Sequence, residues 1–180
     1  MFQLIRPLQR WKEAIDAYLA TITASAAEIN SQCDLSVQGL IVKTKKISIT
    51  AAPTGAEQDT GFDIPAKCRV LDVFVDVTAA EVTGATKTLD VGLKSGEAGG
   101  DADGFLDGIA ATPVGMKKGT LVSTGQTLGV LMRVDEDGAG VLVPEAHVCN
   151  TTAVSVTYTA GSAGWVEFRG SIYIVYAEVG

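Results

Sequence analysis

The chain has 180 residues, of which 47% are hydrophobic and 19% are charged, and its formal net charge is −7. This length predicts one domain with an appendage, and the hydrophobic content is sufficient for a sizeable core. The negative charge argues against a nucleic-acid groove and against an anionic membrane surface, because both need a basic footprint, so we expect no nucleic acid and no membrane among the partners.

Residues 1–39 predict an N-terminal α-helical arm followed by a linker. Apolar residues recur there at helical spacing, and several lie seven residues apart, as in a short coiled-coil seam. The stretch "TITASAAE" interrupts the pattern, so we expect one helix at about 7–20 and a shorter one at about 25–33. The apolar anchors of this arm are Leu8, Trp11, Ile15, Tyr18, Leu19 and Ile22.

A helix of this length is marginal by itself in water and has to pack against another surface. Two interpretations are open: the helix folds back onto its own domain, or it is an arm for oligomerisation or docking. We favour the arm, because residues 40–180 predict a β domain that is complete without it.

From residue 40 onward the hydrophobic period changes from helical to two, the pattern of half-buried strands. In "RVLDVFVDVT", for example, Leu71, Val73, Val75 and Val77 are expected to share one face. The expected strands lie at about 46–50, 69–78, 86–94, 119–122, 126–134, 140–148, 153–159 and 165–179. Turn-forming stretches separate them and no helical stretch intervenes. The sequence therefore predicts a mainly β fold, an antiparallel β-sandwich (a jelly roll of about eight strands), over residues 40–180.

Basic residues are concentrated early in the chain, whereas most acidic residues come later. The early group is Arg6, Arg10, Lys12, Lys43, Lys45 and Lys46. Such an asymmetry can mark a docking end and a solvent-facing end, although a chance distribution is the alternative.

The three cysteines, Cys33, Cys68 and Cys149, are far apart and form no C-x-x-C motif. This spacing favours reduced thiols and assembly in a reducing cytoplasm, with Cys68 as a small core residue. His147, the only histidine, lies two residues before Cys149. A nucleophile pair would need these side chains in contact and a third group to orient them, so we interpret His147 as a strand-edge or interface residue.

The stretch "GGDADGFLDG" at residues 99–108 concentrates three aspartates, Asp101, Asp103 and Asp107. Clustered carboxylates attract calcium, but the glycine follows the second aspartate and no glutamate ends the loop, so an EF-hand is excluded. A looser calcium site remains a weak alternative. We expect no metal and no cofactor, and a loop that buries its apolar residues while the aspartates cap turns. The apolar residues of this stretch are Phe105, Leu106 and Ile109.

Several stretches in this order carry a resemblance: "TGFDIPAKCRVLDVFVDVT", "TKTLDVGL", "DADGFLDG", "KGTL", "RVDEDGAG" and "IYIVY". They resemble the β domain of tailed-phage virion proteins of the capsid decoration (cement) and head-fibre type, and "ITASAAEIN" resembles a segment near the start of head-fibre proteins. The resemblance covers about residues 20–178. It implies a jelly-roll domain, usually trimeric, on the outside of an icosahedral head, where it bridges major capsid subunits, and it implies no enzymatic activity.

We therefore expect a structural virion protein on the outer surface of the head, with the major capsid protein and further copies of the chain (a homotrimer) as its partners. Two alternatives stay open. The first is a receptor-binding or tail-fibre tip module, and the second is a β-sandwich hydrolase.

Overall fold

The computed structural model describes residues 40–121, 127–135, 142–149 and 152–179. In these residues the prediction of a mainly β, antiparallel fold is confirmed, and the residues from Ile41 to Val179 form one compact unit. The predicted arm at 1–39 lies outside the described residues. The strands are β1 (Leu40–Ile49), β2 (Gln58–Ile64), β3 (Cys68–Ala79), β4 (Thr88–Leu93), β5 (Leu106–Ala110), β6 (Gly115–Lys118), β7 (Arg133–Asp135), β8 (Leu142–Pro144), β9 (His147–Cys149), β10 (Val154–Ala160) and β11 (Arg169–Val179).

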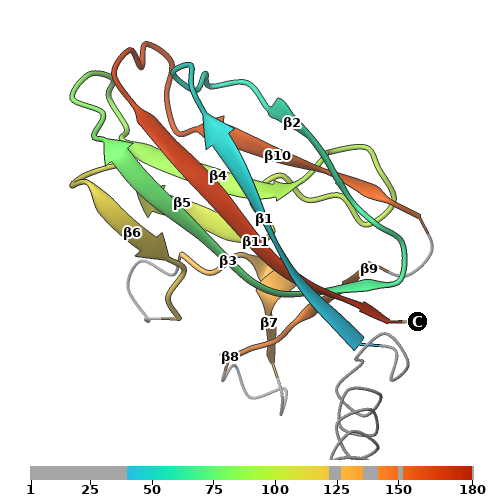
Figure 1. Cartoon of the computed structure of the whole chain (residues 1–180). Helices are drawn as coiled ribbons and strands as arrows, with labels where there is room; N and C mark the ends of the chain where they lie inside the picture. The colour runs from blue at the N-terminus through green and yellow to red at the C-terminus, as the bar shows by residue number, and fades with distance from the viewer. Residues whose placement is uncertain (1–39, 122–126, 136–141, 150–151, 180) are drawn as a thin grey trace, which may run out of the picture. The chain divides into compact units, whose positions relative to one another are not determined.

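Two antiparallel sheets form the body of this unit (Figure 1). The first has the strand order β1-β11-β3-β6, with β9 as an additional partner of β3. The second has the order β2-β10-β4-β5, and β7 and β8 form a separate two-stranded ribbon. Apart from the consecutive strands β4 and β5, neighbouring strands in both large sheets are distant in sequence, so the chain crosses repeatedly from one sheet to the other.

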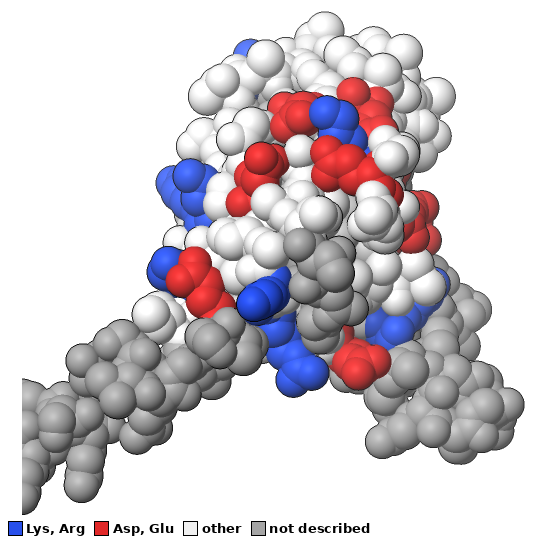
Figure 2. All heavy atoms as spheres, turned by 90° about the vertical axis from the view of Figure 1, so that its right-hand side faces the viewer, with Lys and Arg blue, Asp and Glu red and all other residues white. Residues whose placement is uncertain are grey.

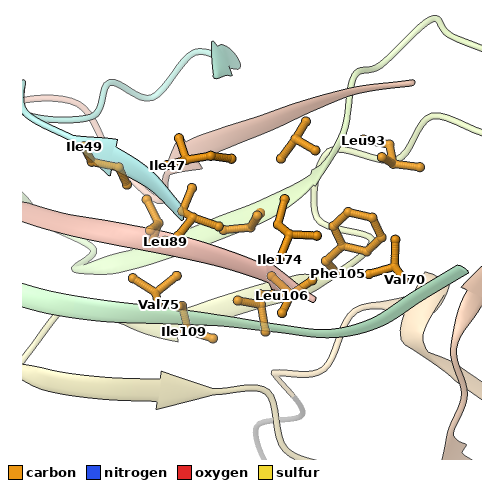
Figure 3. Close-up of a cluster of buried hydrophobic side chains, with 14 of the residues drawn as sticks. Ile47, Ile49, Val70, Val75, Leu89, Leu93, Phe105, Leu106, Ile109 and Ile174 are labelled. Carbon is orange, nitrogen blue, oxygen red and sulfur yellow. The ribbon is translucent and has the colours of Figure 1, made fainter. Parts of the chain in front are cut away.

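The hydrophobic core lies between the two sheets, and Figure 3 shows part of it. Both sheets contribute: Val75 and Ile174 come from the first, and Leu89 and Ile109 from the second. All four are at most 2% exposed. Alternation along each strand sends one set of side chains inward, so a period-two sequence becomes a two-layered core.

The first sheet shows where simple alternation fails. Leu71, predicted to share the core face with the valines after it, is 40% exposed, whereas Val70 is fully buried. Tyr176 of β11 pairs with Val70 and Val175 pairs with Asp72, which leaves Leu71 as an extra residue. This β-bulge reverses the inward and outward positions on one side of it. The expectations for Val73, Val75, Val77 and the core residue Cys68 are confirmed.

The predicted strand at 126–134 is wrong in form. Leu128 makes an isolated bridge to Leu106, Val130–Met132 is a single 3-10 turn, and only Arg133–Asp135 is a strand. Other boundaries also change. The region 140–148 contains two short strands, β8 and β9, no strand starts at 119, and β2, β5 and β6 were not expected.

A buried carboxylate joins two of the connections between the sheets. Glu81, in the loop from β3 to β4, is fully buried and accepts hydrogen bonds through both of its oxygens. Oε1 accepts the N–H of Thr83 at 2.8 Å and also its hydroxyl. Oε2 accepts the backbone N–H groups of Val166, Glu167 and Phe168 at 3.0–3.1 Å, in the loop from β10 to β11. One side chain therefore holds both loops, and we call this arrangement the Glu81 lock.

Further contacts surround the Glu81 lock. The indole N–H of Trp165 donates to the Thr86 carbonyl at 3.1 Å, and its ring packs on Phe168 with centroids 5.4 Å apart. Gly84 adopts a φ of +79°, and a Cβ there would lie 2.8 Å from the Trp165 ring. Only glycine fits this turn without strain.

The Glu81 lock determines the charge state of its carboxyl group. Burial alone would raise the pKa of Glu81, but the hydrogen bonds from Thr83 and the backbone of the opposite loop outweigh burial and lower it to about 2. The ordinary pKa of a glutamate in an unfolded chain is about 4.3. The ionised form therefore stabilises the fold above about pH 4.5, and this contribution is lost as the pH falls towards 2.

We predict that Glu81→Gln lowers the free energy of unfolding at pH 7 by about 2–3 kcal/mol, because an amide cannot accept from all these donors and leaves buried N–H groups unpaired. Urea unfolding measures the change. The matched control is Glu167→Gln, an exposed residue beside the lock, which should stay within about 0.5 kcal/mol of the wild type. Equal destabilisation by both variants would contradict the role assigned to Glu81, and the gap between them should narrow below pH 4.

Candidate functional site

The Asp-rich stretch at 99–108 is partly a loop and partly a strand. Phe105 and Leu106 are fully buried and Ile109 nearly so, which confirms the expected burial of these apolar side chains. The expectation of a loop throughout is wrong, because β5 begins at Leu106 and pairs with β4. Asp103 and Asp107 are exposed, and Asp101 is partly buried.

The loop packs on the backbone of β4. The carbonyl of Asp101 accepts the N–H of Leu93 at 2.7 Å and that of Gly104 at 3.1 Å. A Cβ at Gly92 would lie 2.0 Å from the same carbonyl oxygen, so only glycine permits this approach. The polar loop thus covers the outer face of β4 through its main chain, while its carboxylates remain available to interact with one another.

The carboxylates of this loop repel one another. A hydrogen bond with Asp103, then burial, then the charges of Asp103 and Asp107 raise the pKa of Asp101 to about 6. Burial and the same two charges raise the pKa of Asp90 on β4, although the N–H of Gly108 donates to its Oδ1 at 2.7 Å and acts in the opposite direction. Asp101 and Asp90 therefore hold a proton more readily than isolated aspartates would.

The weak calcium candidates Asp101, Asp103 and Asp107 gain no support from this geometry. Within the described part of the chain, no group of three or more His, Cys, Asp or Glu residues could hold a metal ion. The raised pKa of Asp101 indicates repulsion between neighbouring carboxylates, which a proton would relieve.

His147 lies on β9, a short strand that pairs with β3. Its ring meets the Phe105 ring edge-on with centroids 6.0 Å apart, and burial lowers the pKa of His147. These contacts are those of a half-buried residue on a short strand, and the expected interface position stays a prediction. The side chain of Cys149, the other half of the pair considered from sequence, lies outside the described part of the structure.

A hollow of about 270 Å³ lies beside the bulge of β3. Its lining residues are Leu71, Asp72, Lys118, Gly119, Leu128, Met132, Glu145 and Ala146. Lys118 pairs with Asp72 at 2.5 Å, so one of the two lining carboxylates already has a cation. The lining contains no serine, cysteine or histidine that could act as a nucleophile or as a base of intermediate pKa.

Sequence reasoning missed two features. Glu81 lies in a stretch that was interpreted only as a turn, and nothing in its neighbours distinguishes it from a solvent-exposed acid.

The second feature is a row of side chains on the outer face of the first sheet. Phe74 stacks on Tyr173 with centroids 4.9 Å apart, and the Lys46 ammonium lies 5.7 Å from the centre of the Tyr173 ring. The alternation along β3 predicts that Phe74 points outward, but its partner Tyr173 can be identified only once the pairing register of β3 and β11 is known.

The arm anchors, Leu8 to Ile22, lie outside the described residues. Within the described residues, no helix is long and apolar enough to cross a membrane.

No protein-family model and no curated protein sequence matches the chain. Among solved structures, the "Cyanophage Pam1 capsid asymmetric unit" has a chain with 16% identity, a match covering 77% of this chain and 84% of that one, and a TM-score of 0.46. The "Acidic stable capsid structure of Helicobacter pylori bacteriophage KHP30" has a chain with 16% identity, 75% and 93% coverage, and a TM-score of 0.35. Structural likeness at this level does not support a function. A function has to be argued from the residues of the chain itself.

We predict that the raised pKa of Asp101 makes the fold more stable as the pH falls from above 6 to about 4. The native state takes up a proton in this window that the unfolded chain, with an aspartate pKa of about 3.9, does not. Asp101→Asn imitates the protonated form, so it should raise the melting temperature at pH 7.5 and flatten the dependence on pH. Glu167→Gln, which changes an exposed residue outside this loop, is the control and should do neither. A wild type whose stability is constant between pH 4 and 6.5 would contradict the prediction.

We also predict that calcium and EDTA leave the melting temperature of the full chain unchanged, because the described carboxylates assemble no metal site. Thermal melts with either addition at pH 7.5 measure this. A rise of several degrees with calcium, abolished in Asp103→Asn, would restore the metal interpretation.

Proposed function

We propose that this protein is a structural component of a tailed-phage virion, which decorates and stabilises the outer surface of the head by bridging major capsid subunits as a homotrimer. The proposal rests first on the resemblance of the stretches between residues 60 and 176 to capsid decoration and head-fibre proteins. The structural observation that supports the proposal most is the Glu81 lock, in which a buried carboxylate holds two loops in place by hydrogen bonds.

The jelly-roll assignment is part of this proposal. Strands β1, β11, β3 and β6 lie in one sheet, and β2, β10, β4 and β5 lie in the other. A jelly roll has eight strands in two sheets formed by two Greek keys, and this order supports such an arrangement. The short strands β7, β8 and β9 are then insertions between the sixth and seventh strands of the roll.

The polar groups of the described loops support a structural role. Glu97 accepts the N–H and the hydroxyl of Ser155 at 2.8 and 3.0 Å, and Glu57 accepts the N–H of Ser95 at 2.8 Å. Together with Glu81, these carboxylates tie loops to one another or to a strand rather than converging on a cleft. A module whose loops are held in this way suits a protein that stabilises a capsid.

The arm provides the means of attachment in this proposal. Two of its anchors, Trp11 and Tyr18, are of the residue types that dominate interface energies. A trimer binds through three linked arms, so weak individual contacts add up to strong attachment.

The alternatives are a receptor-binding or tail-fibre tip module and a β-sandwich hydrolase. The position of the protein on an intact virion, on the head or on the tail, separates the proposal from the first alternative. An activity screen with Asp101 and His147 variants as controls tests the second, and we expect nothing above background.

We predict that removing residues 1–33 abolishes binding to phage heads but leaves the β domain folded, because the sandwich has its own core and the anchors are in the removed segment. Binding is measured by co-sedimentation with heads that lack the protein. The matched variant Trp11→Ala/Tyr18→Ala in the full chain should weaken binding without shifting the melting temperature. Decoration by the truncated protein at the wild-type level would contradict the role of the arm.

A further inference from the structure

Three carboxylates act on a single lysine beside the second sheet, and a fourth lies on the neighbouring strand β2. The Lys94 ammonium pairs with Asp59 at 3.1 Å, and Glu57 and Glu97 also act on its charge. Asp63 pairs across the strands with Ser155, which is bonded to Glu97, so Asp63 borders the same group. We call Glu57, Asp59, Asp63 and Glu97 with Lys94 the acidic cluster.

Four cations gather at the end of the sandwich where β1 and β3 begin. Lys43 pairs with Glu178 at 2.7 Å. Glu178 lies opposite Cys68 of β3, and Lys67 and Arg69 are the residues before and after Cys68. Lys45 lies over the Phe62 ring at 5.1 Å from its centre. All four cations are exposed. We call Lys43, Lys45, Lys67 and Arg69 with Glu178 the basic cluster.

The two clusters carry equal and opposite net charge, and β2 contributes to both: Asp59 and Asp63 belong to the acidic cluster, and the Phe62 ring lies under Lys45 of the basic cluster. In Figure 2, acidic side chains predominate in the upper half of one face of the molecule, with a few basic ones among them, and basic side chains predominate in its lower half, with a few acidic ones. Lys67 and Arg69 have no ion-pair partner among the described residues, so their positive charges are available to pair with acidic groups of another molecule.

We propose that this face is an interface between copies of the chain, in which the acidic cluster of one copy meets the basic cluster of the next. A second copy is the partner that the chain itself supplies with matching charge. Nucleic acid fits less well, because the acidic cluster beside the lysines would repel phosphates. An anionic membrane surface is disfavoured for the same reason.

The contact rests on the homotrimer of the proposed function and deepens it by naming the surfaces. In a closed ring each copy gives its acidic cluster to one neighbour and its basic cluster to the other, which is a head-to-tail contact. Opposite charges direct the orientation of approach and penalise like-to-like encounters.

The test is the mass of the full chain in solution, by light scattering after gel filtration, at about 50 mM and about 500 mM salt, since salt screens exposed charges. The first variant reverses the basic cluster (Lys67→Glu/Arg69→Glu), and the second reverses the acidic cluster (Asp59→Lys/Asp63→Lys). A third variant combines all four changes. The matched control, Glu145→Lys/Glu167→Lys, changes two exposed acids outside both clusters. Thermal melting checks that each variant is folded.

We expect the wild type and the control to assemble at low salt and to lose mass at high salt. Each reversed variant should remain monomeric, and the combined variant should assemble again, because it exchanges the two charges. A wild type that is monomeric at low salt, a reversed variant that assembles like the wild type, or a folded combined variant that stays monomeric would each overturn the proposal. Assembly without binding to heads would contradict the proposed function alone.

Discussion

The Glu81 carboxylate is the constraint on which the described fold depends most. The loop from β3 to β4 carries the chain from the first sheet to the second, and the loop from β10 to β11 carries it back. By accepting hydrogen bonds from both loops, one side chain ties two crossings at the same end of the sandwich. A buried charge is costly to desolvate unless donors surround it, and here those donors are main-chain N–H groups that would otherwise be unpaired. Carboxylate and loops therefore need each other.

The Asp-rich loop follows the opposite rule. Its side chains repel one another, so the ionised form of Asp101 is disfavoured where the ionised form of Glu81 is favoured. The loop stays in place because its main chain bonds to β4 and because Phe105 and Leu106 anchor it in the core. The two groups oppose each other as the pH falls: protonation of Asp101 relieves repulsion first, and protonation of Glu81 releases the lock only in stronger acid.

The sequence could predict the elements whose side chains alternate without interruption. Val73, Val75 and Val77 identified β3, and Leu89 and Val91 identified β4, because one buried face imposes a period of two. It failed where the backbone departs from regular pleating. Leu71 keeps the apolar pattern but is displaced by a bulge, and β2, with Gly61 at a φ of +70°, shows no apolar alternation. Glu81 could not be found from sequence, since three of its partners are backbone groups 85 to 87 residues away.

The segregation of charge is a consequence of topology as well as composition. Lys43 and Lys45 were part of an early basic group in the sequence, but Lys67 and Arg69 join them only because β11 brings the end of the chain between β1 and β3. Keeping like charges together on a chain of net charge −7 raises their mutual repulsion, whereas dispersing them among the acids would lower it. Lys45 and Lys46 each make a cation–π contact with an aromatic ring, which offsets part of that repulsion. Lys67 and Arg69 have no such contact in the described structure. An opposing acidic surface removes the repulsion, and the chain carries one beside it.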